Sequence, residues 1–154
     1  MAEAYCLDTG VFIESWWKHY RPKNFRSFWS RLEEGLKSGL LLSPMLVLEE
    51  LKRKDDEVYR WTASVRTFFI ELDGDLQTAQ EGVINQFPKL INQARGRSLC
   101  DPWVIALAQV RACPVVTYET IGSDNKPKIP NVCHALDIRC MTVGDLIEEL
   151  GWEF

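Results

Sequence analysis

Residues 3–13, which read EAYCLDTGVFI, decide the fold of this 154-residue chain. Residues 4–7 form a short apolar run without a turn residue, which predicts a buried strand. Asp8, Thr9 and Gly10 end that strand and open a turn. Residues 11–17 are apolar enough to begin a helix that packs back over the strand. Asp8 is therefore expected at the carboxyl end of a central strand, in the crevice where open α/β sheets bind ligands.

The rest of the chain alternates short apolar strands with longer periodic segments. Further strands are expected at residues 40–42, 114–117 and 138–141, and helices at residues 12–19, 24–37, 43–54, 57–69, 73–87, 101–110, 131–137 and 142–150. Ser43 is predicted to be an N-cap, and Thr142 and Asp145 are predicted to form a capping box. Strands joined by helices pair in parallel. We therefore expect one α/β domain over residues 1–154, a three-layer α/β/α sandwich with a short parallel central sheet.

Composition narrows the class of protein. Apolar residues make up 46% of the chain and charged residues 26%, which is ordinary for a soluble globular protein. The net charge of −4 argues against a passive nucleic-acid binder but allows an acidic metal centre with a local basic rim. No apolar run has the length of a membrane span, and residues 1–4 carry no basic targeting segment. Five cysteines without a C-x-x-C pattern indicate reduced thiols, so we expect a cytoplasmic protein.

Four acidic residues fall at strand ends or on helices that follow strands. Asp8 follows the first strand, and Glu50 lies on the helix after the second. Asp101 begins the most apolar helix, and Glu119 lies two residues beyond the strand at 114–117. Clustered carboxylates without Cys or His ligands suit Mg²⁺ or Mn²⁺. Such ions activate a water molecule and stabilise the charge that develops on a phosphoryl group.

Each acid also has a simpler explanation. A carboxylate at a strand end can accept hydrogen bonds from neighbouring backbone N–H groups, as Asp8 would. Asp101 followed by Pro102 is typical of a helix N-cap. Glu49 and Glu50 can both be solvated, with basic partners four residues later. Glu119 can be an ordinary loop charge.

Other kinds of site are poorly supported. Only His19 and His134 are present, so no Ser-His-Asp arrangement is credible, and the chain has no Gly-rich phosphate loop. Cys133 and His134, followed by Cys140, form a weak zinc pattern whose spacing fits no standard site. An aspartate-nucleophile phosphatase would need a second acid in the turn after Asp8, and that turn reads TGV.

Four segments together resemble a known family. They are LDTGVF at residues 7–12, EELK at 49–52, CDPWVIALA at 100–108 and VVTYE at 115–119. The ordered set is similar to the PIN domain, and more narrowly to the VapC-like toxin ribonucleases of prokaryotic toxin–antitoxin modules. The resemblance implies a parallel sheet between helices and a metal-dependent nuclease site that acts on single-stranded RNA. It also implies a cognate antitoxin protein as partner, and dimers by family analogy.

The resemblance assigns roles residue by residue. Asp8, Glu50 and Asp101 match the three family acids that hold Mg²⁺ or Mn²⁺, and Glu50 matches better than Glu49 because Leu51 follows it. Glu119 stands where many members have an Asp as a fourth acid. Thr117 would orient a carboxylate or a water molecule. All four acids are therefore predicted as catalytic and metal-binding residues of an endoribonuclease.

Residues that would contact RNA are scattered along the chain. The basic ones are Arg21, Lys23, Arg26, Lys52, Arg53, Lys54, Arg95, Arg97, Lys126 and Lys128, which either form a phosphate rim or are ordinary solvated charges. Trp16, Trp17 and Trp103 either stack on bases or belong to the core or an interface. The alternative function is a non-catalytic PIN-like module that binds RNA or another protein.

Overall fold

A short parallel sheet lies at the centre of the protein. The computed structural model describes residues 2–92 and 99–154. Within them the strands are β1 (Tyr5–Leu7), β2 (Leu41–Leu42), β3 (Val115–Val116) and β4 (Cys140–Met141). Their order in the sheet is β2-β1-β3-β4, and every pair is parallel. The predicted α/β class with a parallel central sheet is therefore confirmed.

Strand β1 is a central strand, as its apolar sequence predicts. Cys6 pairs with Leu42 on one side and with Val115 on the other. All three residues of β1 are fully buried, which is the pattern of a strand covered on both faces. Because β1 and β3 are parallel, the residues that follow them emerge at the same edge of the sheet.

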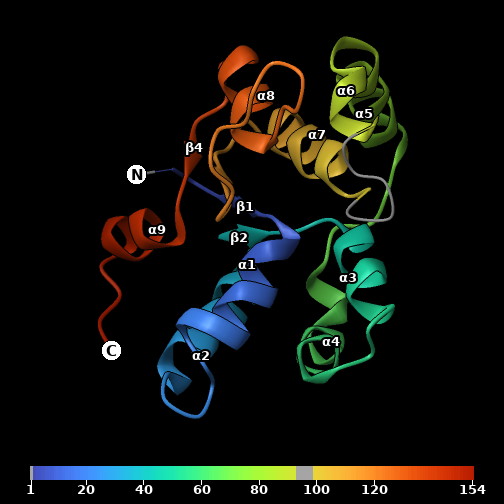
Figure 1. Ribbon diagram of the computed structural model, residues 1–154. Helices are drawn as coiled ribbons and strands as arrows, with labels where there is room; N and C mark the ends of the chain where they lie inside the picture. The colour runs from blue at the N-terminus through green and yellow to red at the C-terminus, as the bar shows by residue number, and fades with distance from the viewer. Residues whose placement is uncertain (1, 93–98) are drawn as a thin grey trace.

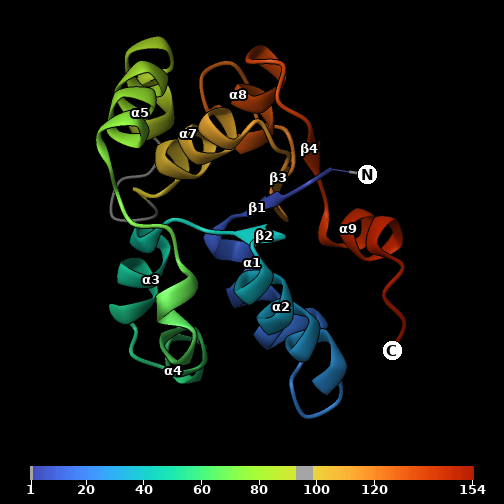
Figure 2. The ribbon, with the colours of Figure 1, turned by 180° about the vertical axis from the view of Figure 1, so that it is seen from behind.

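Helices connect the strands and cover the sheet (Figures 1 and 2). In chain order they are α1 (Thr9–Glu14), the π-helix η1 (Ser15–His19), α2 (Arg26–Ser38), α3 (Met45–Lys52), α4 (Glu57–Ser64), the 3₁₀ turn η2 (Arg66–Phe68), α5 (Gly74–Gln86), α6 (Pro88–Asn92), α7 (Asp101–Arg111), α8 (Ile129–Ala135) and α9 (Val143–Leu150). Helix α7 lies on one side of β1 with α5 and α8 beside it, and α1 and α2 lie on the other side. The sheet is thus the middle layer of an α/β/α arrangement.

The apolar character of α7 explains its position. Residues 104–108 (VIALA) are all buried, and α5 packs along this helix. A helix that is apolar on nearly every face must be covered on several sides, so α7 lies between the sheet and α5. This packing fixes the first residue of α7, Asp101, next to the end of β1.

Several predicted boundaries are wrong for physical reasons. The helix expected over residues 57–69 ends at Ser64, because Val65 leaves the helical conformation and a 3₁₀ turn follows. Ser43 caps no helix: it is fully buried, and its hydroxyl donates to the carbonyl oxygen of Leu7. Thr142 and Asp145 do form the predicted capping box at the start of α9.

The structure contains no membrane-spanning helix among residues 2–92 and 99–154. All five cysteines are free thiols, and Cys140 is the one that is only partly buried. The fold does not support the weak zinc pattern of Cys133, His134 and Cys140. Cys133 is buried beside Cys140, and His134 is exposed on α8.

Candidate active site

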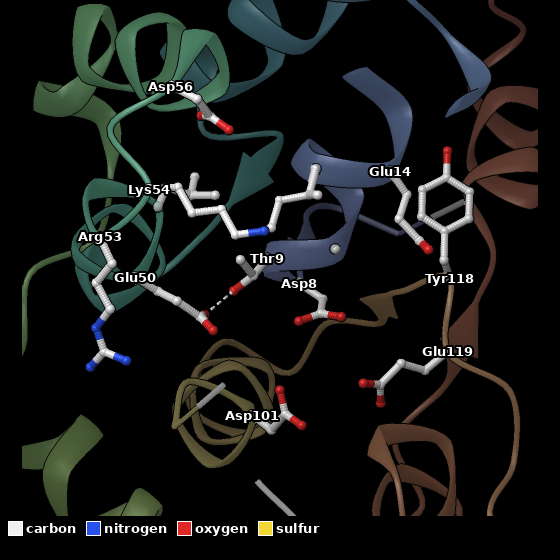
Figure 3. A pocket seen from close by; sticks show the side chains of 13 residues that line it. Asp8, Thr9, Glu14, Glu50, Arg53, Lys54, Asp56, Asp101, Tyr118 and Glu119 are labelled. Carbon is white, nitrogen blue, oxygen red and sulfur yellow. Dashed lines mark hydrogen bonds between the residues drawn. The ribbon is translucent and has the colours of Figure 1, made fainter. Parts of the chain in front are cut away.

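A pocket of about 590 Å³ opens at the carboxyl ends of β1 and β3. All four predicted acids line it, and each comes from a different part of the chain. Asp8 follows β1, Glu50 projects from α3, Asp101 begins α7, and Glu119 follows β3 (Figure 3). We call this the acidic pocket. Glu14 and Asp56 also line it, so the described wall holds six carboxylates, against the two cations Arg53 and Lys54.

Asp8 is the most buried of these acids, with 4% of its surface exposed. The hydroxyl of Thr117 donates a hydrogen bond of 2.9 Å to its Oδ2. Burial raises the pKa of the Asp8 carboxyl to about 7, and the charges of Glu119 and Glu50 add to that rise. The Thr117 hydroxyl and the backbone N–H of Thr9 oppose the shift because they stabilise the charged form. Asp8 therefore sits where a cation would relieve a real electrostatic penalty.

The structure distinguishes Glu50 from Glu49. Glu50 is partly buried and lines the acidic pocket, where its Oε2 accepts a hydrogen bond of 2.8 Å from Thr9 Oγ1. Glu49 is exposed and lies 3.8 Å from Arg66 Nη2 in a surface ion pair. Adjacent residues of a helix point about 100° apart, so only one of the two can face the pocket. Thr9 is a site residue that the sequence analysis missed; its position directly after Asp8 was the available signal.

Asp101 is 8% exposed, and its carboxylate points into the pocket from the first turn of α7 (Figure 3). The N-cap of α7 is Cys100, which makes no side-chain capping bond, so the capping explanation of Asp101 is not what the helix shows. An acid in the first turn is still favoured by the helix dipole. Asp101 is thus held by α7 beside Asp8.

Glu119 lines the pocket and also forms a hydrogen bond with the backbone at the start of α8. Its Oε1 accepts a hydrogen bond of 3.0 Å from the backbone N–H of Ile129, the first residue of α8. Its own N–H donates to Thr117 Oγ1 at 3.0 Å. One carboxylate oxygen of Glu119 therefore accepts from the backbone at the start of α8, whereas Asp8 and Glu50 accept from the hydroxyl groups of Thr117 and Thr9.

The predicted basic residues separate into groups. Arg53 and Lys54 line the acidic pocket and make no ion pair with any described acid. Lys52, Lys126 and Lys128 are exposed and line other surfaces. Arg95 and Arg97 lie outside the described residues. Trp16 and Trp103 are partly buried against the core, and Trp17 is exposed.

Tyr118 closes one side of the acidic pocket. Its hydroxyl lies 2.7 Å from that of Ser15, and the ring of His19 stacks on it with centroids 4.9 Å apart. Burial raises the pKa of the Tyr118 hydroxyl to about 12, so this group stays protonated at neutral pH. The sequence analysis did not single out Tyr118, because an aromatic residue between Thr117 and Glu119 carries no local signal of its contacts.

Comparison with known proteins gives one match. The family model of a domain of unknown function, DUF4411, matches residues 5–154. The chain belongs to this family. No curated protein and no solved structure matches it. The DUF4411 description assigns no activity, so the resemblance to PIN-domain ribonucleases stays a prediction from the sequence.

The acids of this DUF4411 protein fit a hard divalent cation by their chemistry. They are oxygen donors that are partly or fully buried, and together they leave the pocket strongly negative. As the side chains lie, however, no three His, Cys, Asp or Glu residues among those described are gathered closely enough to hold one ion. Carboxylates without a counter-ion repel one another, and a bound cation would draw them together through side-chain rotation. The donor set thus suits Mg²⁺ or Mn²⁺.

Proposed function

We propose that this protein is a Mg²⁺- or Mn²⁺-dependent endoribonuclease that hydrolyses phosphodiester bonds of RNA. The observation that carries the proposal is that four acids from four separate elements line one pocket at the carboxyl edge of a parallel sheet. Asp8 and Glu50 accept hydrogen bonds from Thr117 and Thr9, which aim their carboxylates at this pocket. Burying an acidic group such as Asp8 costs free energy unless it is compensated. A cation supplies that compensation.

Asp8, Glu50 and Asp101 would hold the ion, and Glu119 would approach it with its second oxygen. The ion supplies Lewis-acid stabilisation of the charge that develops on a phosphoryl group. Thr9 and Thr117 keep the carboxylates of Glu50 and Asp8 oriented through the hydrogen bonds described above. Arg53 and Lys54 lie on the wall of the same pocket, where their charges attract the RNA backbone.

The biological setting follows from the resemblance alone. The protein would act in the cytoplasm as the toxin of a toxin–antitoxin module, held inactive by a cognate antitoxin protein. The resemblance to PIN-domain toxins also implies a homodimer.

A non-catalytic RNA-binding or protein-interaction module is the second candidate. Two observations favour it: Glu119 is occupied at the start of α8, and the described acids are not gathered around one point. In that case Asp8 would be neutralised by protonation, as its raised pKa allows.

An RNA cleavage assay tests the proposal. We expect the wild-type protein to cleave single-stranded RNA with Mg²⁺ or Mn²⁺ and to be inactive in EDTA. Asp8→Asn and Asp101→Asn should each lower the rate by at least about 100-fold, because each removes a charged ligand. Glu49→Gln is the matched control for Glu50→Gln, since Glu49 faces Arg66 outside the pocket. Binding of RNA without cleavage under any divalent ion would establish the non-catalytic module instead.

A further inference from the structure

A second pocket, of about 360 Å³, lies beyond the acidic pocket along the same helix. Its walls include Trp16 and Trp17 of η1, Arg21 and Lys23 of the following turn, and Glu57 at the start of α4. We call it the tryptophan pocket. Neither the acids nor their hydrogen-bond partners reach it, so the proposed chemistry does not account for it.

Two stretches of the chain line both pockets: the helix that runs from α1 into η1, and the residues at the start of α4. Ile13 and Glu14 line the acidic pocket, and Trp16 and Trp17 line the tryptophan pocket three residues later on one continuous helix. Residues three or four apart lie on the same helix face. On the opposite wall, Asp56 lines the first pocket and the adjacent Glu57 lines the second. A chain that leaves the acidic pocket along α1 therefore arrives at the tryptophan pocket.

The local backbone is unusual at this point. Helix α1 continues as the π-helix η1, and the N–H of Tyr20 donates to the carbonyl oxygen of Ser15, five residues back, at 2.6 Å. Such π turns are rare and are found frequently at functional sites. Trp16 packs edge-on against Trp29 with ring centroids 4.8 Å apart, whereas Trp17 remains 39% exposed. The π turn thus ends in an exposed indole beside a cavity.

The cations of this pocket have no acidic partners. Arg21 uses its Nε to donate to the backbone carbonyl oxygen of Trp17 at 3.1 Å, which holds the guanidinium group against the backbone of η1. Neither Arg21 nor Lys23 forms an ion pair with an acid in the described part of the chain. Glu57 is the one acid on this wall, and it lies in the first turn of α4, where the helix dipole stabilises a carboxylate. Among the described residues, this pocket thus combines an exposed indole with two cations that form no ion pair.

We propose that the tryptophan pocket is a subsite for single-stranded RNA. Trp17 stacks on a base, and Arg21 and Lys23 bind the flanking phosphates. This inference rests on the proposed function and adds to it a second binding site, which would hold the same RNA strand several nucleotides away from the acidic pocket. From Asp8 to Trp17 the helix rises roughly 13 Å at 1.5 Å per residue. That distance spans about four stacked nucleotides at 3.4 Å each, or fewer if the strand is extended.

Binding of labelled RNA, measured by fluorescence anisotropy in EDTA, tests the subsite without cleavage. A ten-nucleotide single strand should bind the wild type, and Trp17→Ala should weaken binding roughly 5- to 100-fold through loss of stacking. Trp17→Phe should restore most of the affinity, because a phenyl ring also stacks. Arg21→Ala and Lys23→Ala should each reduce the slope of log affinity against log salt by about 0.7.

Matched controls separate the subsite from general effects. Phe154→Ala removes another exposed aromatic side chain, and Arg31→Ala removes an exposed cation that lines neither pocket; neither should alter RNA binding.

Equal binding by the wild type and by Trp17→Ala would overturn the subsite, even if the wild type cleaves RNA. A wild type that binds but never cleaves would overturn the nuclease, while a Trp17-dependent affinity would still support the subsite. A wild type that does not bind RNA overturns both, and preference for a polyglutamate peptide would reassign the pocket to an acidic protein segment.

Discussion

At the scale of single residues, Asp8 is the most informative side chain of the protein. It is buried, it accepts a hydrogen bond from Thr117, and it lies near two further acids. A carboxyl group in that setting favours its protonated form until a cation arrives. The same residue is therefore expected to reduce the stability of the metal-free protein and to contribute to function when an ion is bound.

Removal of this charge should stabilise the protein in EDTA. The pKa of Asp8 is raised to about 7, so the folded state disfavours ionisation. Because the folded pKa lies above the unfolded value, the penalty is absent below about pH 4, grows between about pH 4 and 7, and is constant above. Asp8→Asn should therefore increase the free energy of unfolding by up to about 4 kcal/mol at pH 8, since the pKa rises from 3.8 to about 7 and each pKa unit corresponds to 1.36 kcal/mol. Chemical denaturation in EDTA at pH 5 and pH 8 measures the difference.

Addition of Mg²⁺ or Mn²⁺ should reverse the order of stability. A ligand that binds only the folded state stabilises it, and Asp8→Asn should lose most of that gain. Glu49→Gln serves as the control, because its carboxylate faces Arg66 and should not alter the response to metal. If Asp8→Asn were no more stable than the wild type in EDTA at pH 8, the charge of Asp8 would not be the source of strain.

At the scale of elements, the side chain of Asn131 makes three of the hydrogen bonds that hold the loop after β3. Oδ1 of Asn131 accepts from the N–H groups of Gly122 at 2.7 Å and Lys128 at 2.9 Å, and its Nδ2 donates to the Gly122 carbonyl at 2.8 Å. Glu119 closes the same loop onto α8 through Ile129. The loop is thus part of the site, because it fixes where the fourth acid lies.

Gly122→Ala should disturb this loop. A Cβ at position 122 would lie 2.2 Å from the carbonyl oxygen of Lys126, and a backbone atom cannot move aside as a flexible side chain can. We expect a loss of about 1–3 kcal/mol in the free energy of unfolding and faster amide hydrogen exchange in residues 119–128. Gly82→Ala on α5 is the matched control: its Cβ would meet no atom within 4 Å, so the change should be neutral or stabilising. Equal effects of the two changes would contradict the assigned close approach.

At the scale of the whole molecule, one side-chain cluster joins the first strand to the last helix. The hydroxyl of Tyr5, in β1, donates to Glu149 of α9. Both terminal nitrogens of Arg139 donate to the same carboxylate, at 2.6 and 3.3 Å. The contact between Tyr5 and Glu149 spans 144 positions of the chain. These three residues therefore fasten α9 across the edge of the sheet.

Low pH should weaken the contact of Glu149 with Arg139 and Tyr5. The hydrogen bonds from Arg139 and Tyr5 lower the pKa of Glu149 to about 2. Because the folded pKa lies below the unfolded value, the contribution to stability is complete above about pH 4.5 and is lost as the pH falls toward 2. Glu149→Gln should thus be less stable than the wild type at pH 6, and the difference in melting temperature should shrink by pH 2.5. Glu148→Gln, one position earlier on α9, is the control. A constant difference over this pH range would contradict the prediction.

The sequence by itself determined the parallel α/β arrangement and the positions of Asp8 and Asp101. Both follow from local patterns: a short apolar run that ends in a turn, and an apolar helix with an acid at its start. Parallel strands bring their carboxyl ends to one edge whatever their distance along the chain. The sequence also placed Glu119 near that edge, two residues beyond its strand.

Only the tertiary structure decided how the side chains around the site are oriented. The resemblance already favoured Glu50 over Glu49, and the tertiary structure supplies the physical reason: packing of Leu48 and Leu51 fixes the rotation of α3 and turns Glu50 toward Thr9 and Glu49 toward Arg66. The tertiary structure likewise gave Glu119 a hydrogen bond with α8, packed Trp16 against Trp29 and brought Arg21 to the backbone carbonyl of Trp17. These outcomes depend on contacts between distant segments, and local periodicity does not encode the rotation of a helix or the path of a loop to that precision.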